Sequence, residues 1–163
     1  MKKITVLFSA LLLTIALLTG CNSSAPSKSS SSGISTHILD DMEGPPKNGH
    51  TIQKHVGKSD DELKNRIKSE HVSAASTYYT KDVANKAVVD SLKQNDRKIK
   101  QWLEQSGPNR LVIKATHSFA VGKTVVRKNL QIYENVERTL TVLQRDAKSK
   151  LHYKIVTSYP IQR

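Results

Sequence analysis

Two side chains suited to phosphoryl chemistry lie close together between residues 49 and 66. His55 carries an imidazole, which titrates near neutral pH and can accept or donate a proton. Arg66 carries a guanidinium, which stays charged and can bind a phosphate through two parallel donors. Ser59 and Glu62 form a capping-box pattern, so we expect a helix that begins just after Ser59 and carries Arg66 on its second turn. The segment therefore predicts a site for a phosphate-bearing substrate.

A second histidine and two lysines lie near His55 in the sequence. Lys54 and Lys58 can contact the phosphates of a nucleic acid, and a solvated basic face is an equally good interpretation of both. His50 can orient His55 or touch a substrate, or it can do no more than satisfy a turn. The five-residue spacing does not place both histidines on one helix face, and no Cys/His cluster has zinc spacing. We therefore expect no metal site and no cofactor.

The last predicted strand, residues 151–162, supplies two hydroxyl groups. Thr157 and Tyr159 share one face because side chains alternate along a strand, and the two positions are about 7 Å apart. Threonine and tyrosine are also common strand residues, and the spacing alone favours this structural explanation. A role in binding or catalysis therefore needs further support.

The elements that would position these groups change character at Gly107-Pro108, where a helix must end. Apolar residues recur at helical spacing over residues 81–103, with a break near Asn95-Asp96, and a short extended segment at 74–79 precedes them. After Pro108 the chain is rich in Val, Ile, Thr and Tyr. We expect strands at residues 110–116, 124–127, 130–136, 138–145 and 151–162. Helices followed by antiparallel strands predict an α+β domain.

The charge of the chain is strongly basic. The 26 Lys and Arg residues exceed the 14 Asp and Glu residues, which gives a net charge of +12. Residues 1–44 hold equal numbers of basic and acidic residues, so the whole excess falls on residues 45–163. Such a surface favours a polyanion, namely nucleic acid, anionic lipid or acidic wall polymer. The charge does not choose among these, and a soluble protein that is merely basic fits it as well.

The N-terminal segment has the order of features found in a bacterial lipoprotein. A basic start is followed by an apolar run from Ile4 to Leu18, which is too short to span a membrane and fits a secretory signal. The run ends in a motif that resembles the lipobox, with lipidation at Cys21. We expect a signal peptide at 1–20, a lipidated cysteine and Ser-rich linker at 21–44, and a folded domain at 45–163. Cys21 is the only cysteine, so no internal disulfide can form.

Three motifs, in this order, resemble the bacterial ribonuclease A-like toxin domain. They are His55 with Val56-Gly57-Lys58, the helix that carries Arg66, and the closing segment Val156-Thr157-Ser158-Tyr159-Pro160. That domain forms the C-terminal tips of contact-dependent inhibition toxins and related secreted toxins. The resemblance covers residues 49–160 and implies N-terminal helices followed by a curved antiparallel sheet. This fold is similar to that of pancreatic ribonuclease but lacks its disulfides.

The resemblance also implies a catalytic set, because the family's His, Arg, Thr and Tyr fall on His55, Arg66, Thr157 and Tyr159. The implied reaction is metal-independent cleavage of RNA, in which the ribose 2′-hydroxyl attacks the adjacent phosphorus and leaves a 2′,3′-cyclic phosphate. DNA would be spared because it lacks the 2′-hydroxyl.

Each member of this set has an expected role. His55 would act as general base or acid, since an unperturbed imidazole titrates near working pH. Arg66 would stabilise charge on the phosphoryl oxygens. Thr157 and Tyr159 would donate hydrogen bonds to the phosphate. Tyr159 is one candidate for protonating the leaving oxygen, and the sequence does not decide which group supplies that proton.

Two features depart from the family pattern. The domain follows a short lipoprotein leader rather than a long delivery protein, and positions 157 and 159 offer no second histidine, so the two-histidine mechanism of pancreatic ribonucleases cannot be carried over.

The first hypothesis is an extracytoplasmic ribonuclease with RNA as substrate, held at the membrane through Cys21, with a toxin role. It is expected to be a monomer, with an immunity protein as a partner. The alternative is a non-catalytic basic lipoprotein that binds nucleic acid or anionic wall polymer, and a third hypothesis is a toxin domain that keeps the fold without the activity.

Overall fold

The computed structural model describes residues 33–162. The predicted signal peptide, the predicted lipidation site at Cys21 and most of the predicted linker lie outside the described residues. In chain order the elements are α1 (Ile38–Met42), α2 (Thr51–His55), α3 (Asp60–Ser69), β1 (Ala74–Tyr78), α4 (Lys81–Gln94), α5 (Asp96–Glu104), β2 (Arg110–Thr116), β3 (Gly122–Val126), β4 (Ile132–Val136), β5 (Arg138–Arg145) and β6 (Tyr153–Pro160). Within this part of the chain, no helix has the length and apolar character needed to span a bilayer.

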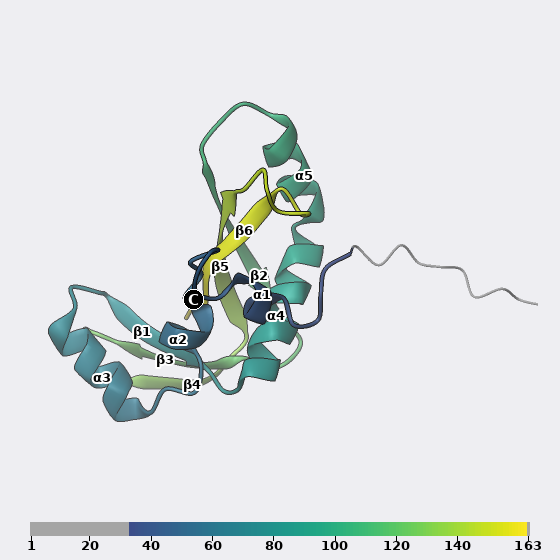
Figure 1. Cartoon of the computed structure of the whole chain (residues 1–163). Helices are drawn as coiled ribbons and strands as arrows, with labels where there is room; N and C mark the ends of the chain where they lie inside the picture. The colour runs from purple at the N-terminus through teal and green to yellow at the C-terminus, as the bar shows by residue number, and fades with distance from the viewer. Residues whose placement is uncertain (1–32, 163) are drawn as a thin grey trace, which may run out of the picture. The chain divides into compact units, whose positions relative to one another are not determined.

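The described strands form two antiparallel sheets of three strands each, in the orders β1-β3-β4 and β2-β5-β6. Helix α3 packs against β1 and β3, and α4 packs against β2 and β5 (Figure 1). The short helix α2 contacts both β1 and β6, so it lies where the two sheets meet. The predicted α+β class is confirmed, with helices α1–α3 ahead of the described strands and α4 and α5 between β1 and β2.

Local sequence signals set the ends of the helices. The Ser59 hydroxyl accepts a hydrogen bond from the Glu62 N–H (3.2 Å), and the Glu62 carboxylate accepts one from the Ser59 N–H (2.8 Å). The predicted capping box is therefore formed, and α3 begins directly after Ser59. The Thr80 hydroxyl caps α4 by accepting a hydrogen bond from the Val83 N–H at 3.2 Å. Asn95 separates α4 from α5, at the position of the predicted break.

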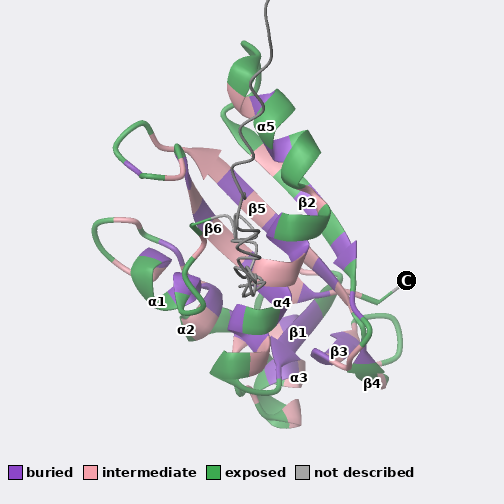
Figure 2. Cartoon of the chain, turned by 90° about the vertical axis from the view of Figure 1, so that its right-hand side faces the viewer, coloured by how far each residue is buried: buried purple, intermediate pink, exposed green. Residues whose placement is uncertain are grey.

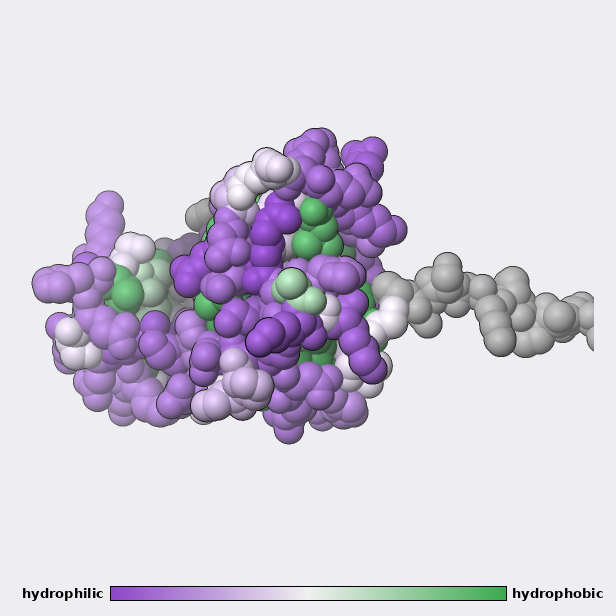
Figure 3. All heavy atoms as spheres, turned by 45° about the horizontal axis from the view of Figure 1, so that its top comes forward, coloured by the Kyte–Doolittle hydropathy of each residue, from purple (hydrophilic) through white to green (hydrophobic). Residues whose placement is uncertain are grey.

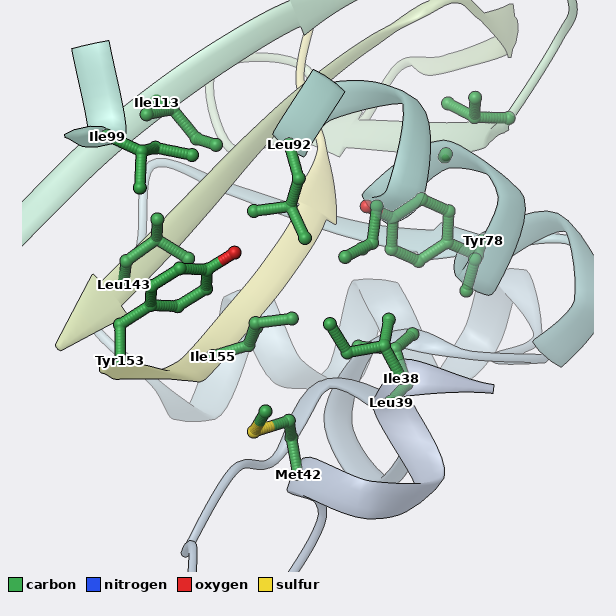
Figure 4. Close-up of a cluster of buried hydrophobic side chains, with 14 of the residues drawn as sticks. Ile38, Leu39, Met42, Tyr78, Leu92, Ile99, Ile113, Leu143, Tyr153 and Ile155 are labelled. Atoms are coloured by element: carbon green, nitrogen blue, oxygen red, sulfur yellow. The ribbon is translucent and has the colours of Figure 1, made fainter. Parts of the chain in front are cut away.

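Most buried apolar side chains form one core between the sheet β2-β5-β6 and the helices α1, α4 and α5 (Figures 2 and 4). Its most enclosed members, all at most 1% exposed, include Tyr78, Leu92, Ile113, Leu143 and Ile155. A smaller cluster lies between α3 and the sheet β1-β3-β4 and consists of Leu63, Ile67, Ala75 and Val125. Each sheet therefore packs against its own cluster of buried side chains.

Helix α1 precedes residue 45, where we expected the folded domain to begin, yet its apolar side chains are part of the core. Ile38 and Leu39 are each 1% exposed, and an ion pair of 2.9 Å between Asp40 and Lys81 joins α1 to α4. The compact unit accordingly includes α1. The acidic and Pro/Gly-rich composition around α1 concealed this apolar face.

Hydrophilic residues cover most of the face of the molecule shown in Figure 3, with small apolar areas between them. Among the described residues, the large apolar side chains that are exposed are those of Tyr79 and Val112. A partner that meets this face would therefore do so mainly through polar and charged groups, in keeping with the net charge of +12.

Candidate active site

The four side chains of the predicted catalytic set line one cleft of about 770 Å³. They come from three elements: His55 from α2, Arg66 from α3, and Thr157 and Tyr159 from β6. The strands β1 and β3 form another wall of the cleft. Residues that are far apart in the sequence thus meet at the junction of the two sheets.

Helix α2 is fixed to β6 by one backbone hydrogen bond and one bond to a side-chain hydroxyl, and this places His55 in the cleft. The His50 N–H donates to the Val156 carbonyl at 3.1 Å, and the Ser158 N–H donates to the Thr51 hydroxyl at 2.8 Å. Two N–H groups in the first turn of α2 donate to the carboxylate of Glu43, at 2.8 and 3.0 Å. A carboxylate is a favourable partner there because the free N–H groups of a helix lie at its N-terminus.

His55 is buried, with 7% of its surface exposed, and its ring has two defined neighbours. Its Nδ1 lies 3.2 Å from the carbonyl oxygen of Ser76, and its ring stacks on that of Tyr159 with centroids 5.0 Å apart. A carbonyl oxygen only accepts hydrogen bonds, so Nδ1 must carry the proton. In the neutral ring Nε2 is then the unprotonated nitrogen, which is the form that a general base requires.

The pKa of His55 is lowered to about 4, chiefly because burial disfavours the charged ring. The hydrogen bond to Ser76 opposes this shift, while the charges of Arg66, His50 and Lys54 add to it. The imidazole is therefore neutral at neutral pH. This corrects the expectation that its pKa would lie near its unperturbed value.

Arg66 lies on the second turn of α3 and has part of its hydrogen-bonding capacity free. Its Nε donates to the Glu70 carboxylate at 3.0 Å, and Nη1 donates to the Lys54 carbonyl at 3.5 Å. A guanidinium has five N–H donors, so these bonds leave three for a ligand. The side chain is 22% exposed. Arg66 can thus bind an anion in the cleft while Glu70 holds its orientation.

The predicted substrate-binding residues divide between two places. His50 lines the cleft, and its pKa is lowered, first by burial and then by the positive charge of Lys54. Lys54 and Lys58 line an adjoining groove of about 370 Å³ between α2 and α3. Arg66 lines both spaces, so a strand of phosphates could run from the groove into the cleft.

Thr157 and Tyr159 point to the cleft because they share one face of β6, as predicted. The Thr157 hydroxyl is enclosed and has no hydrogen-bond partner among the described residues. Ser158, between them, faces the opposite side and is fully buried, with hydroxyl contacts to Tyr78 (2.6 Å) and Thr141 (2.8 Å). The strand therefore carries an enclosed, unpartnered hydroxyl on the face that lines the cleft and a satisfied hydroxyl on its interior face.

Several lining residues were not assigned from the sequence. Ser76 acts through its backbone carbonyl, which no side-chain pattern reveals, and Thr124 lies on β3, far from the motifs. His71 also lines the cleft.

His117, for which the sequence suggested no partner, does not line the cleft and lies in a separate buried network. Its Nδ1 is 2.6 Å from the Asp90 carboxylate, and its Nε2 is close to the Thr139 hydroxyl.

Residues 33–162 contain no group of three or more histidine, cysteine or carboxylate side chains placed to hold a metal ion. The chemistry available in the cleft is that of a neutral imidazole, a guanidinium and hydroxyl groups. These groups can remove a proton from a hydroxyl and stabilise negative charge on a phosphate.

Comparison with known proteins agrees with this geometry. Residues 49–160 match the model of the family described as the bacterial CdiA-CT RNase A domain. A chain in the crystal structure of the CdiA-CT/CdiI complex from Y. kristensenii 33638 is similar in structure, with a TM-score of 0.66 and 30% sequence identity. The similarity covers 70% of this chain and 100% of that one. No curated protein matches this chain. Because the family match spans most of the chain, this protein belongs to the bacterial CdiA-CT RNase A domain family.

Proposed function

We propose that this protein is an endoribonuclease toxin that cleaves RNA by transesterification. The ribose 2′-hydroxyl attacks the neighbouring phosphorus, the bond to the 5′-oxygen breaks, and a 2′,3′-cyclic phosphate remains. The observation that carries the proposal is the convergence of His55, Arg66, Thr157 and Tyr159 in one cleft. Family membership supports the same reaction class.

His55 is the general base of this reaction. Its Nδ1 donates to the Ser76 carbonyl, so Nε2 receives the proton of the 2′-hydroxyl. The pKa of about 4 keeps the imidazole unprotonated at neutral pH, although it also makes the ring a weaker base. Burial thus increases the fraction of His55 that is unprotonated and lowers the basicity of its imidazole.

The other three side chains stabilise the phosphate. The free donors of Arg66 bind the phosphoryl oxygens as negative charge develops there, in a partly enclosed site where such bonds are strong. The unpartnered hydroxyl of Thr157 donates to the same group. Tyr159 protonates the leaving 5′-oxygen, and its phenolate regains a proton from the His55 imidazolium through water.

The proposal includes a location and partners. The signal-peptide pattern and Cys21 support a lipid-anchored protein on the extracytoplasmic side, which would separate the enzyme from the RNA of its own cell. The similarity to a chain of a CdiA-CT/CdiI complex supports an immunity protein as a partner of this chain. The toxin is expected to be a monomer in its free state.

The test is incubation of the purified protein with mixed RNA and with DNA in the presence of a metal chelator. Cleavage of RNA alone, with cyclic-phosphate ends, would support the proposal. His55→Ala should lower turnover by a factor of at least a hundred while RNA binding is retained. The matched control is His152→Ala, since His152 is exposed and does not line the cleft. Cleavage that requires an added divalent metal, or survives His55→Ala, would contradict the mechanism.

The same experiment separates the enzyme from a non-catalytic binder of nucleic acid or wall polymer, which the charge of +12 would equally suit. For a binder, His55→Ala and Arg66→Ala should each cause only a modest loss of affinity that depends on salt. For the enzyme, the loss should appear in turnover.

A further inference from the structure

Strand β6 contains one residue more than the facing part of β5. Ile155 lies opposite Leu143, and Thr157 lies opposite the residue before it on β5, Val142. Val156 therefore has no partner of its own in the pairing of the two strands. An extra residue of this kind is a β-bulge, which bends the strand that contains it. Bulges are common next to active sites, where they change the direction of a side chain.

The bulge reverses the alternation of buried side chains along β6. Tyr153 and Ile155, ahead of the bulge, point into the main core and are 5% and 1% exposed (Figure 4). In an unbroken strand Thr157 and Tyr159 would share that buried face, because side chains two positions apart lie on the same side. After the bulge it is instead Ser158 that is fully buried, and Thr157 and Tyr159 line the cleft. The extra residue thus allows one strand to serve the core and the cleft in turn.

The alternation along β5 is unbroken, which locates the change in β6. Thr141 and Leu143 are both buried, and they lie opposite Ser158 and Ile155. The two buried positions are two residues apart on β5 and three residues apart on β6. The contact of 2.8 Å between the hydroxyls of Thr141 and Ser158 fixes the pairing after the bulge.

The bulge also supplies a carbonyl group to helix α2. The carbonyl oxygen of Val156 accepts a hydrogen bond from the His50 N–H at 3.1 Å, directly before the helix. Two positions later, the Ser158 N–H donates to the Thr51 hydroxyl at 2.8 Å. One short segment of β6 therefore holds the first turn of the helix that ends in His55.

We infer that Val156 is a positioning residue of the proposed ribonuclease site. The bend of the bulge and the Val156 carbonyl hold α2 against β6, so that the His55 imidazole stacks on the Tyr159 ring with centroids 5.0 Å apart. The role belongs to the backbone, because the valine side chain does not line the cleft. The effect on catalysis rests on the proposed function, whereas the arrangement of the two rings can be measured without cleavage.

Deletion of Val156 tests this role. With Thr157 directly after Ile155, all the other pairs of β5 and β6 stay in register, so the same side chains still face the cleft. The deletion removes only the bend and the carbonyl that binds the His50 N–H. We expect kcat to fall about a hundredfold, since a misplacement of about 1 Å between reacting groups has an effect of this size. KM should stay within about threefold, because the phosphate-binding Arg66 lies on α3.

Two further variants serve as controls. Val156→Ala keeps the extra residue and its carbonyl, so its kcat should stay within about threefold of the wild-type value. Deletion of Ser106 removes one residue from the exposed loop between α5 and β2, where the loss of a residue is tolerated, and should leave kcat unchanged. Circular dichroism and urea unfolding show which variants are folded.

Nuclear magnetic resonance of the ring pair separates positioning from a loss of stability. The ring current of Tyr159 shifts the carbon-bound protons of the stacked His55 imidazole, and His55→Ala identifies their signals. We expect this shift to decrease when Val156 is deleted and to persist in Val156→Ala and in the variant without Ser106. A folded deletion variant with the wild-type kcat and the wild-type His55 shift would overturn the inference.

The wild-type protein gives a test that needs no variant. A scalar coupling across the hydrogen bond should join the His50 nitrogen to the Val156 carbonyl carbon, and its absence would overturn the inference. If the deletion variant does not fold, Val156→Gly decides, because glycine loosens the backbone at the bulge. Its kcat and its His55 shift should decrease together, and wild-type values of both would contradict the role of Val156. Absence of cleavage by the wild type would instead overturn the proposed function and leave the resonance measurements to decide.

Discussion

The imidazole of His55 owes its proposed role to three neighbours on different elements. The Ser76 carbonyl fixes its tautomer, the Tyr159 ring covers one face, and the Arg66 guanidinium adds to the effect of burial on its pKa. The charge of Arg66 favours the neutral ring, the Ser76 carbonyl leaves Nε2 as the free nitrogen, and the Tyr159 ring limits how the imidazole can turn. A residue that looks like an ordinary titrating histidine in the sequence is thus held in its basic form well below neutral pH.

A pH profile follows from this lowered pKa. A general base works when deprotonated, and the pKa of His55 is about 4 in the folded protein. We expect log kcat/KM to rise with pH up to about 4 and to stay level through neutral pH, since this parameter reports groups of the free enzyme. The measurement uses short RNA substrates over the pH range in which circular dichroism shows the protein to be folded. An inflection at the ordinary histidine value of 6.5 would show that another group is the base.

Arg66 offers a test of geometry at constant charge. Replacement by lysine keeps the positive charge but loses the planar fork that can bind two oxygens of one phosphate. We expect Arg66→Lys to lower kcat at least tenfold, with a smaller change in the affinity for RNA, because the lost bonds are strongest in the transition state. Lys68→Arg is the control on the same helix, and it should leave kcat unchanged. Equal kcat for Arg66→Lys and the wild type would indicate that the charge alone matters.

Helix α2 is the element that connects the two ends of the domain. It has only five residues, too few to be stable alone, so its position depends on contacts with β6 and Glu43. The helix brings His55 to a strand that lies about a hundred residues later in the sequence. His55 therefore keeps its place in the cleft only while α2 stays packed against β6.

Thr51→Val tests this docking. The substitution leaves the buried N–H of Ser158 without its partner at 2.8 Å, which should cost about 1–3 kcal/mol of unfolding free energy. We also expect kcat/KM to fall, because α2 is released from β6 near Tyr159. Urea unfolding and initial rates measure the two effects. Unchanged stability would show that the Thr51 hydroxyl does not hold the helix.

The sequence predicted elements whose signals are local. The capping box at Ser59, the break between the helices near Asn95 and the shared face of Thr157 and Tyr159 all depend on residues a few positions apart. The helix end predicted at Gly107-Pro108 was wrong by three residues, because α5 already ends at Glu104. The division of the strands into two sheets could not be predicted, because it depends on pairings between distant segments such as β1 with β3. Ser76 and Thr124 entered the site through that pairing, so no motif could identify them.

The charge of the whole molecule raises the question of whether RNA binds to a defined path or to a general positive field. A net charge of +12 attracts any polyanion, and its effect should decline with salt wherever the charges lie. The groove with Lys54 and Lys58, which joins the cleft at Arg66, instead suggests a defined path for the phosphates. Two variants of equal net charge can separate these explanations.

Lys54→Ala/Lys58→Ala removes two charges beside the cleft, and Lys148→Ala/Lys150→Ala removes two from the exposed turn between β5 and β6. Each contacted phosphate of a single strand contributes about −0.7 to the slope of log K against log salt. If RNA follows the groove, the first variant should reduce the slope by about 1.4 and the second should leave it unchanged. Binding is measured with catalytically impaired His55→Ala as the background, so that the RNA stays intact. Equal slopes in the two variants would show that the positive field of the whole domain, rather than a path of contacts, holds the RNA.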